Sequence, residues 1–255
     1  MKNNQIVDEL IEEIGNNQEI VKSFEIRNSL STDIFDSKDD EFFMHEEIKK
    51  KLMDVTDKFM DYLDIEFFIH DVILTGSLAN YNWSKYSDVD LHILVDYNET
   101  DYNLDILKGF FNSKRSLWNK QHEILIKGFD CEIYVQDVNE PHHASGIYSV
   151  LNDEWLVTPV KTVQSIDKSM ILKKSEDFED RIDDISERFD KGEDVLEDIK
   201  LLKVKLKKFR QSGLDGGGEF SYENLAFKLL RRNGYIGKLL DIQTKTTDKK
   251  LSIEQ

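Results

Sequence analysis

Two aspartates one residue apart, Asp88 and Asp90, are the residues of this sequence best suited to chemistry. They begin the segment 88–95, in which polar and apolar side chains alternate as in a half-buried strand. Residues two apart in a strand face the same way, so the two carboxylates project together. Like charges held close together are unfavourable unless a cation lies between them, and oxygen ligands suit Mg²⁺. The pair therefore predicts a hard-cation site.

A phosphate-binding turn is predicted just ahead of this pair. Gly76-Ser77 follows the apolar run 72–74 and precedes a short helix that we expect at 78–83. Backbone N–H groups at such a turn, together with the serine hydroxyl, are suited to a phosphate.

A third acid would complete a two-metal site, which clamps the attacking and leaving oxygens of an in-line phosphoryl displacement. Glu132 fits this need because it lies between Cys131 and Ile133 in an apolar run. Asp130, two residues earlier on the same strand face, stays open as the alternative.

The elements that must position these residues alternate between helical and strand patterns up to Pro159. Between helices expected at 5–14 and 45–63, the polar stretch 31–43 is predicted to be a loop. The other predicted elements are strands at 72–74 and 88–95, a helix at 102–121, a hairpin of 124–126 and 131–135, and strand pieces at 146–151 and 155–157.

After Pro159 the strand patterns stop, and residues 165–212 are predicted to form one or two long charged helices. The glycine-rich segment 212–219 is expected to interrupt them. Ser221 then caps a helix that Gly234 ends, 236–242 begins a last helix, and the polar tail from Thr244 is expected to fray. We therefore predict two domains, 1–160 and 161–255.

The ordered set of motifs resembles the DNA polymerase β-like nucleotidyltransferase superfamily. That superfamily has an apolar strand, Gly-Ser, a spacer, Asp-x-Asp on a second strand and a third acid in a later apolar strand. The matching parts here are Leu74-Thr75-Gly76-Ser77, the spacer 78–87, Asp88-Val89-Asp90 and Cys131-Glu132-Ile133. The resemblance covers residues 45–160, and phrases such as GSLANYNWSKYSD are more loosely similar to uncharacterised nucleotidyltransferases predicted in tailed bacteriophages and bacteria.

The resemblance implies an α/β (α+β) fold, in which a nucleotidyltransferase-type mixed β-sheet with flanking helices precedes a helical C-terminal domain. It implies an enzyme that transfers a nucleoside monophosphate from an NTP, with ATP expected, to an acceptor hydroxyl and releases pyrophosphate. Two Mg²⁺ ions, replaceable by Mn²⁺, would be bound by Asp88, Asp90 and Glu132, and Glu132 would also help to deprotonate the acceptor. Gly76 and Ser77 would hold the nucleotide.

Further nucleotide contacts are expected from Lys85 and Ser87 in the spacer. For Lys85 the alternative is a position in an exposed loop. Arg231 and Arg232 are candidates because a guanidinium pairs with phosphate in bidentate geometry, and a solvated surface is the alternative.

Composition limits the partners. The chain carries 51 Asp and Glu against 34 Lys and Arg, which opposes non-specific attraction to nucleic acid or to anionic membranes. It has no apolar run of the length, about 18 residues, that spans a membrane, so we expect neither a membrane segment nor a signal peptide. Cys131 is the only cysteine, which favours a cytoplasmic location.

The acceptor stays open. Residues 200–255 hold 13 Lys and Arg against six Asp and Glu, which favours RNA, such as a tRNA 3′ end. The acidic remainder would suit a basic small molecule, as in antibiotic-modifying relatives, and a protein hydroxyl is a further alternative. A non-catalytic nucleotide-binding or RNA-binding module is the rival outside the enzymes. The oligomeric state is not predicted.

Overall fold

A computed structural model describes residues 15–39, 41–65, 67–99, 102–141, 144–162 and 165–253. Contacts divide the described chain into two compact units. Residues 26–162 form the sheet unit, and residues 15–25 together with 165–253 form the helical unit. Residues 15–22 are helical, whereas the helix predicted at 5–14 lies outside the described residues.

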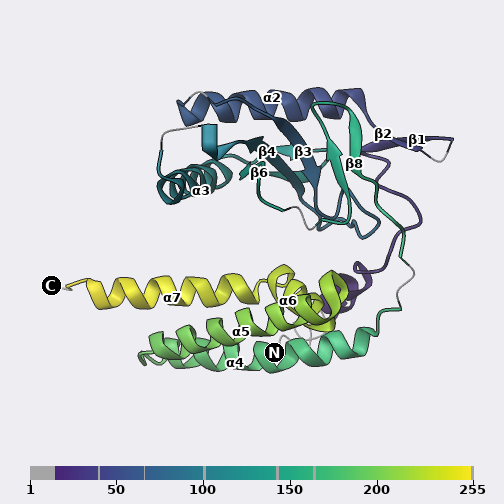
Figure 1. The fold of residues 1–255 in the computed structure, drawn as a ribbon. Coiled ribbons are helices and arrows are strands. Elements are labelled where there is room, and N and C mark those ends of the chain that lie inside the picture. The colour runs from purple at the N-terminus through teal and green to yellow at the C-terminus, as the bar shows by residue number, and fades with distance from the viewer. Residues whose placement is uncertain are drawn as a thin grey trace. The chain divides into compact units, whose positions relative to one another are not determined.

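The sheet unit contains a six-stranded mixed sheet, with strand order β5-β6-β4-β3-β7-β8 (Figure 1). β4 and β6 run parallel, and every other neighbouring pair is antiparallel. The strands are β3 (Asp71–Thr75), β4 (Val89–Val95), β5 (Leu125–Ile126), β6 (Phe129–Asp137), β7 (Ile147–Ser149) and β8 (Glu154–Val157). The predicted strands and the predicted hairpin at 124–135 are confirmed.

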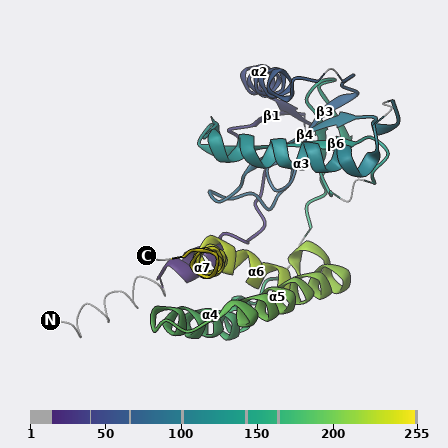
Figure 2. The ribbon, with the colours of Figure 1, turned by 90° about the vertical axis from the view of Figure 1, so that its left-hand side faces the viewer.

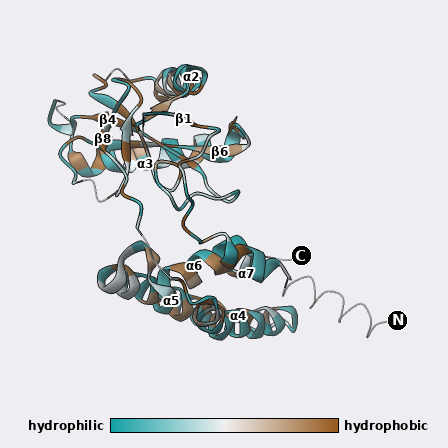
Figure 3. Cartoon of the chain, turned by 90° about the vertical axis from the view of Figure 1, so that its right-hand side faces the viewer, coloured by the Kyte–Doolittle hydropathy of each residue, from teal (hydrophilic) through white to brown (hydrophobic). Residues whose placement is uncertain are grey.

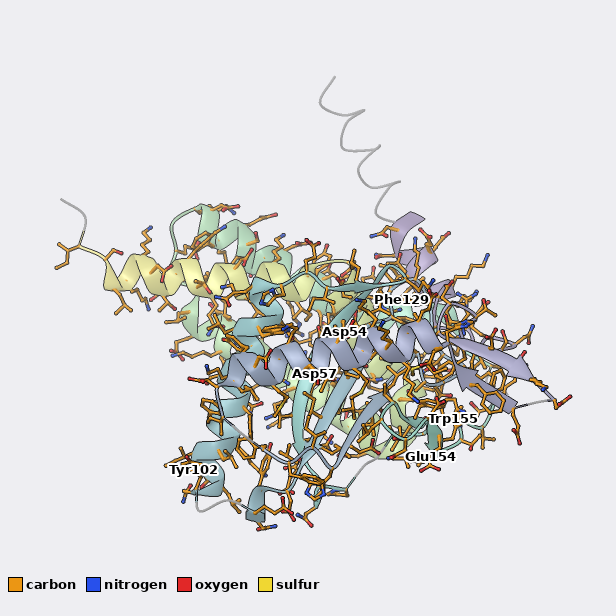
Figure 4. All side chains as sticks on the ribbon, turned by 90° about the horizontal axis from the view of Figure 1, so that it is seen from above. Asp54, Asp57, Tyr102, Phe129, Glu154 and Trp155 are labelled. Atoms are coloured by element: carbon orange, nitrogen blue, oxygen red, sulfur yellow. The ribbon has the colours of Figure 1, made fainter. Side chains whose placement is uncertain are left out.

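Two helices of the sheet unit, α2 (Glu46–Leu63) and α3 (Leu104–Gln121), pack on one face of this sheet (Figure 2). Apolar residues at helical spacing on α2, such as Leu52 and Phe59, join Leu74 and Leu91 of the strands in one core. Asp54 and Asp57 lie on the exposed face of α2 (Figure 4). The predicted mixed α+β architecture is therefore confirmed.

The predicted loop at 31–43 is wrong, because it contains a β-hairpin of β1 (Phe35–Lys38) and β2 (Glu41–Met44). Phe35 is buried and stacks on Trp155 with ring centroids 5.1 Å apart. The indole Nε1 of Trp155 donates a hydrogen bond to the backbone oxygen of Phe42 at 2.8 Å. These distant contacts, rather than local alternation, stabilise the hairpin.

The helical unit is built from α4 (Lys168–Asp190), α5 (Leu196–Gly217), α6 (Tyr222–Arg232) and α7 (Tyr235–Leu251). Helix α6 contacts each of the other three. Their inward-facing residues form a separate core that includes Phe178, Ile182, Leu206 and Leu239. In Figure 3 these ribbons mix hydrophilic teal with hydrophobic brown, as expected of amphipathic helices.

Two predicted helix ends in this unit are wrong. Helix α5 continues through the glycine-rich segment to Gly217, and a short 3₁₀ turn then leads to Ser221, which caps α6 as predicted. A Cβ atom at Gly213 would lie 2.6 Å from Glu223 Cβ, so this glycine permits close packing of α5 on α6. Helix α7 extends past Thr244 to Leu251, because Thr246 is buried and bonds back to the Ile242 carbonyl.

Candidate active site

The candidate site begins where β3 ends, at Gly76. The φ angle of Gly76 is +76°, in the left-handed region that other residues adopt only with strain. A Cβ atom added here would lie 2.0 Å from Asp90 Oδ2. The backbone at Gly76 therefore lies directly against the Asp90 carboxylate, and no other residue type fits without displacing it.

Three serines hold the spacer that follows. The Ser77 hydroxyl donates a hydrogen bond to Ser87 Oγ at 2.7 Å, and the backbone N–H of Ser84 donates to the same oxygen at 2.9 Å. Ser84 and Ser87 are buried. Two of the predicted nucleotide-binding residues, Ser77 after β3 and Ser87 just ahead of β4, therefore lie within hydrogen-bond distance of each other.

The short helix predicted at 78–83 is wrong, because residues 76–82 form successive turns and bends. Asn80 explains the difference. Its side-chain oxygen accepts a hydrogen bond from the Tyr81 N–H at 2.7 Å, and its amide nitrogen donates to Ser145 Oγ at 2.5 Å. Such side-chain bonds compete with a helical hydrogen-bond ladder.

The sheet brings two of the predicted catalytic acids together. In the parallel pair of β4 and β6, Asp90 lies opposite Glu132, and on its other side Asp90 lies opposite Thr75 of β3. Burial alternates over the first four residues of β4, with Asp90 and His92 partly exposed, whereas Ile93, Leu94 and Val95 are all buried. Asp88 directly precedes β4 and is also partly exposed.

Asp130, the alternative third acid, is exposed and pairs with Leu125 in the β5–β6 hairpin. The register therefore places Glu132, rather than Asp130, opposite Asp90. Lys85 is exposed in the turn before β4, with its Nζ 5.0 Å from the ring centroid of Tyr86.

Sequence reasoning missed Tyr134, whose hydroxyl donates a hydrogen bond to Glu132 Oε2 at 2.5 Å. The Tyr134 ring stacks on His92 with centroids 4.7 Å apart, and the Arg115 guanidinium of α3 lies 4.6 Å from its centroid. His92 Nδ1 lies 2.8 Å from Gln136 Oε1. Glu132 and Tyr134 are two residues apart in a predicted strand, so the sequence indicated that their side chains share a face, although Tyr134 belongs to none of the motifs.

The charges of the two facing acids affect their neighbours. The pKa of the Cys131 thiol is raised to about 12, mainly by burial and then by the negative charges of Asp90 and Glu132. The pKa of Tyr134 is also raised, first by burial and next by its hydrogen bond to Glu132. Both groups therefore stay protonated at neutral pH, and Tyr134 remains a hydrogen-bond donor to Glu132.

The two predicted arginines lie in the helical unit. Arg231 is exposed at the end of α6. Arg232 donates a hydrogen bond to Ser23 Oγ at 2.9 Å, and its guanidinium lies 4.9 Å from the ring centroid of Phe24. Arg232 thus helps to join residues 15–25 to the rest of the helical unit.

The donor set of Asp88, Asp90 and Glu132 consists of carboxylate oxygens, which hard cations such as Mg²⁺ prefer. Among the described residues, no group of three or more His, Cys, Asp or Glu side chains is placed to hold a metal ion. The three predicted ligands thus have the oxygen chemistry that suits a divalent cation, and the register sets Asp90 opposite Glu132, but the described structure does not bring all three together as a metal-binding group.

No helix in the described ranges is long and apolar enough to cross a membrane. The chain matches no family model, no curated protein and no solved structure at a significant level.

Proposed function

We propose that this chain is a nucleotidyltransferase, which transfers a nucleoside monophosphate from an NTP to an acceptor hydroxyl and releases pyrophosphate. The observation that carries the proposal is the register that sets Asp90 opposite Glu132, with the Gly76 turn against the Asp90 carboxylate. The mixed sheet with α2 and α3 on one face supports the nucleotidyltransferase-type fold that the motif resemblance implies.

The nucleotide would bind at the turn after β3. Backbone N–H groups at this turn would donate hydrogen bonds to a phosphate, and the Ser77 hydroxyl would do so by exchanging its bond to Ser87 Oγ for one to the phosphate. Three carboxylates next to a triphosphate would repel it. Divalent cations held by Asp88, Asp90 and Glu132, two Mg²⁺ ions by resemblance, would supply the positive charge that the phosphates need.

Glu132 would accept the proton of the acceptor hydroxyl. General bases of this kind contribute roughly 10²–10⁴-fold to a rate. Because the Tyr134 hydroxyl donates to Oε2, the orientation of the Glu132 carboxylate is restricted before substrate binds. Tyr134 is therefore a positioning residue in this proposal.

The expected NTP is ATP, and RNA is the acceptor that the basic segment 200–255 favours. Arg231, exposed at the end of α6, stays a proposed nucleotide contact, and so does Arg232. A cytoplasmic location stays a prediction from the single cysteine, Cys131.

Incubation with each α-³²P-labelled NTP and Mg²⁺ or Mn²⁺ tests the proposal, in the presence of total RNA, cell protein or a metabolite pool. We expect label in one of these fractions, and the fraction identifies the acceptor class. Asp90→Asn and Glu132→Gln should each lower labelling by about 10²-fold or more. Asp130→Asn is the matched control, since it makes the same change in charge at an exposed carboxylate of the same strand.

Full labelling by Asp90→Asn would contradict the assignment of the site. A loss of labelling in Asp130→Asn alone would move the third acid to that residue. Metal-dependent NTP binding without labelling of any fraction would identify a non-catalytic binding module instead.

A further inference from the structure

A pocket of about 330 Å³ lies in the helical unit, between α5, α6 and α7. Its apolar lining includes Leu206, Leu214, Phe227 and Leu239. Leu240, also in the lining, is 44% exposed, so the pocket opens to solvent. Its volume falls in the range of small-molecule sites, roughly 300–1,000 Å³.

The charged residues that line this pocket are all cations: Lys203, Lys207 and Arg210. Their spacing of four and then three residues places them on one face of α5. No Asp or Glu is among the described residues of the lining, although acids outnumber bases 51 to 34 in the chain. The pocket is therefore a positive site on an acidic protein.

Intramolecular ion pairs do not explain these cations. On the same helix, Lys200 pairs with Glu197 at 2.6 Å and Lys205 with Asp177 at 3.3 Å. Within the described part of the chain, none of the three pocket cations forms an ion pair with a carboxylate.

The partners that the structure does give two of these cations are neutral. Lys203 donates to Gln243 Oε1 at 2.7 Å, and Arg210 Nε donates to Asn224 Oδ1 at 3.3 Å. The Arg210 guanidinium also lies 4.8 Å from the ring centroid of Phe227, at the border between the cations and the apolar lining. Their positive charges thus remain available to an anion.

We propose that this pocket binds a small organic anion. Its compact apolar or aromatic body would lie against Leu206, Phe227 and Leu239, and its carboxylate, sulfonate or phosphate would lie at Lys207 and Arg210. Its lining shares no residue with the Asp90–Glu132 site, and the inference does not depend on the proposed transfer reaction.

Fluorescence titration of the full chain with anilinonaphthalene sulfonate, an aromatic anion, tests the inference. We expect one saturable site per chain, with binding that weakens as salt is added. The neutral analogue phenylnaphthylamine should bind at least about tenfold more weakly, because it lacks the charge that the cations attract. Equal affinity for the charged and neutral probes would overturn the proposal.

Variants locate the site. Lys207→Glu combined with Arg210→Glu should weaken binding of the anionic probe by about tenfold or more. The matched control combines Lys208→Glu with Lys245→Glu, which changes the net charge equally at exposed positions outside the lining. An equal loss of affinity in both double variants would overturn the proposal, since it would show a response to net charge alone.

A measurement on the unmodified chain does not depend on folding of the variants. Methyl NMR with the anionic probe should shift the signals of Leu206, Leu214, Leu239 and Leu240. Shifts centred on methyl groups of the sheet unit would place the probe elsewhere and overturn the assignment.

Discussion

At the scale of single residues, the candidate site depends on one close approach. The Asp90 carboxylate occupies the space that the methyl group of an alanine at position 76 would need. Gly76 therefore carries two constraints, its positive φ angle and this contact. Gly128, in the β5–β6 turn, has a similar φ of +86° but nothing within 4 Å of an added Cβ atom.

Alanine substitutions at Gly128 and Gly76 separate the cost of the positive φ angle from the cost of the contact with Asp90. Gly128→Ala should lower the free energy of unfolding by about 1 kcal/mol, the usual cost of a left-handed alanine. Gly76→Ala should cost about 1–3 kcal/mol more, because Asp90 must move as well. Urea denaturation of both variants measures the difference. Equal losses would show that Asp90 does not lie against Gly76.

At the scale of elements, a glycine in α5 also permits a close approach, here between two helices. Gly213 lies where α5 meets α6, and an added Cβ would lie 2.7 Å from Ser221 Oγ and 2.6 Å from Glu223 Cβ. Gly216, one turn later in the same helix, has nothing within 4 Å of such an atom. In the glycine-rich segment, Gly213 is therefore needed for the packing of α5 on α6, whereas Gly216 has room for a side chain.

Alanine at these two positions should change stability in opposite directions. Gly216→Ala should raise the free energy of unfolding by up to about 1 kcal/mol, because alanine favours the helix. Gly213→Ala should lower it by about 1–3 kcal/mol, since α6 must shift to accept the methyl group. Thermal or urea denaturation gives both values. Stabilisation by Gly213→Ala would contradict the close contact.

At the scale of the whole molecule, the main hydrophobic core of the sheet unit and the core of the helical unit are separate clusters. Leu91 belongs to the core of the sheet unit, and Leu239 belongs to that of the helical unit. Each side chain is buried, with 0% and 1% exposure respectively. Each core therefore stabilises its own unit.

A substitution that shortens a core side chain should destabilise mainly the unit to which that side chain belongs. Leu239→Ala should cost about 2–5 kcal/mol and speed hydrogen exchange in α4–α7 while β3, β4 and β6 keep their protection. Leu91→Ala should give the reverse pattern. Mass spectrometry of exchanged peptides makes the comparison, and uniform acceleration across the chain would contradict two separate cores.

Local periodicity was enough to predict α2, α3, β3, β4 and the β5–β6 hairpin, because each buries one face and its sequence shows the matching period. The order of Gly76-Ser77, Asp88, Asp90 and Glu132 likewise stood in the sequence. The amphipathic nature of residues 165–212 predicted helices, though not where α5 ends.

Tertiary structure decided what depends on distant contacts. The β1–β2 hairpin forms against Trp155, the turn after Gly76 is set by Asn80 and Ser145, and α7 continues because Thr246 is buried. The sheet register set Glu132 opposite Asp90, and the packing of α3 next to β6 brought Arg115 to Tyr134. A sequence records which residues are present and their local period, whereas these pairings depend on the energy of packing segments far apart along the chain.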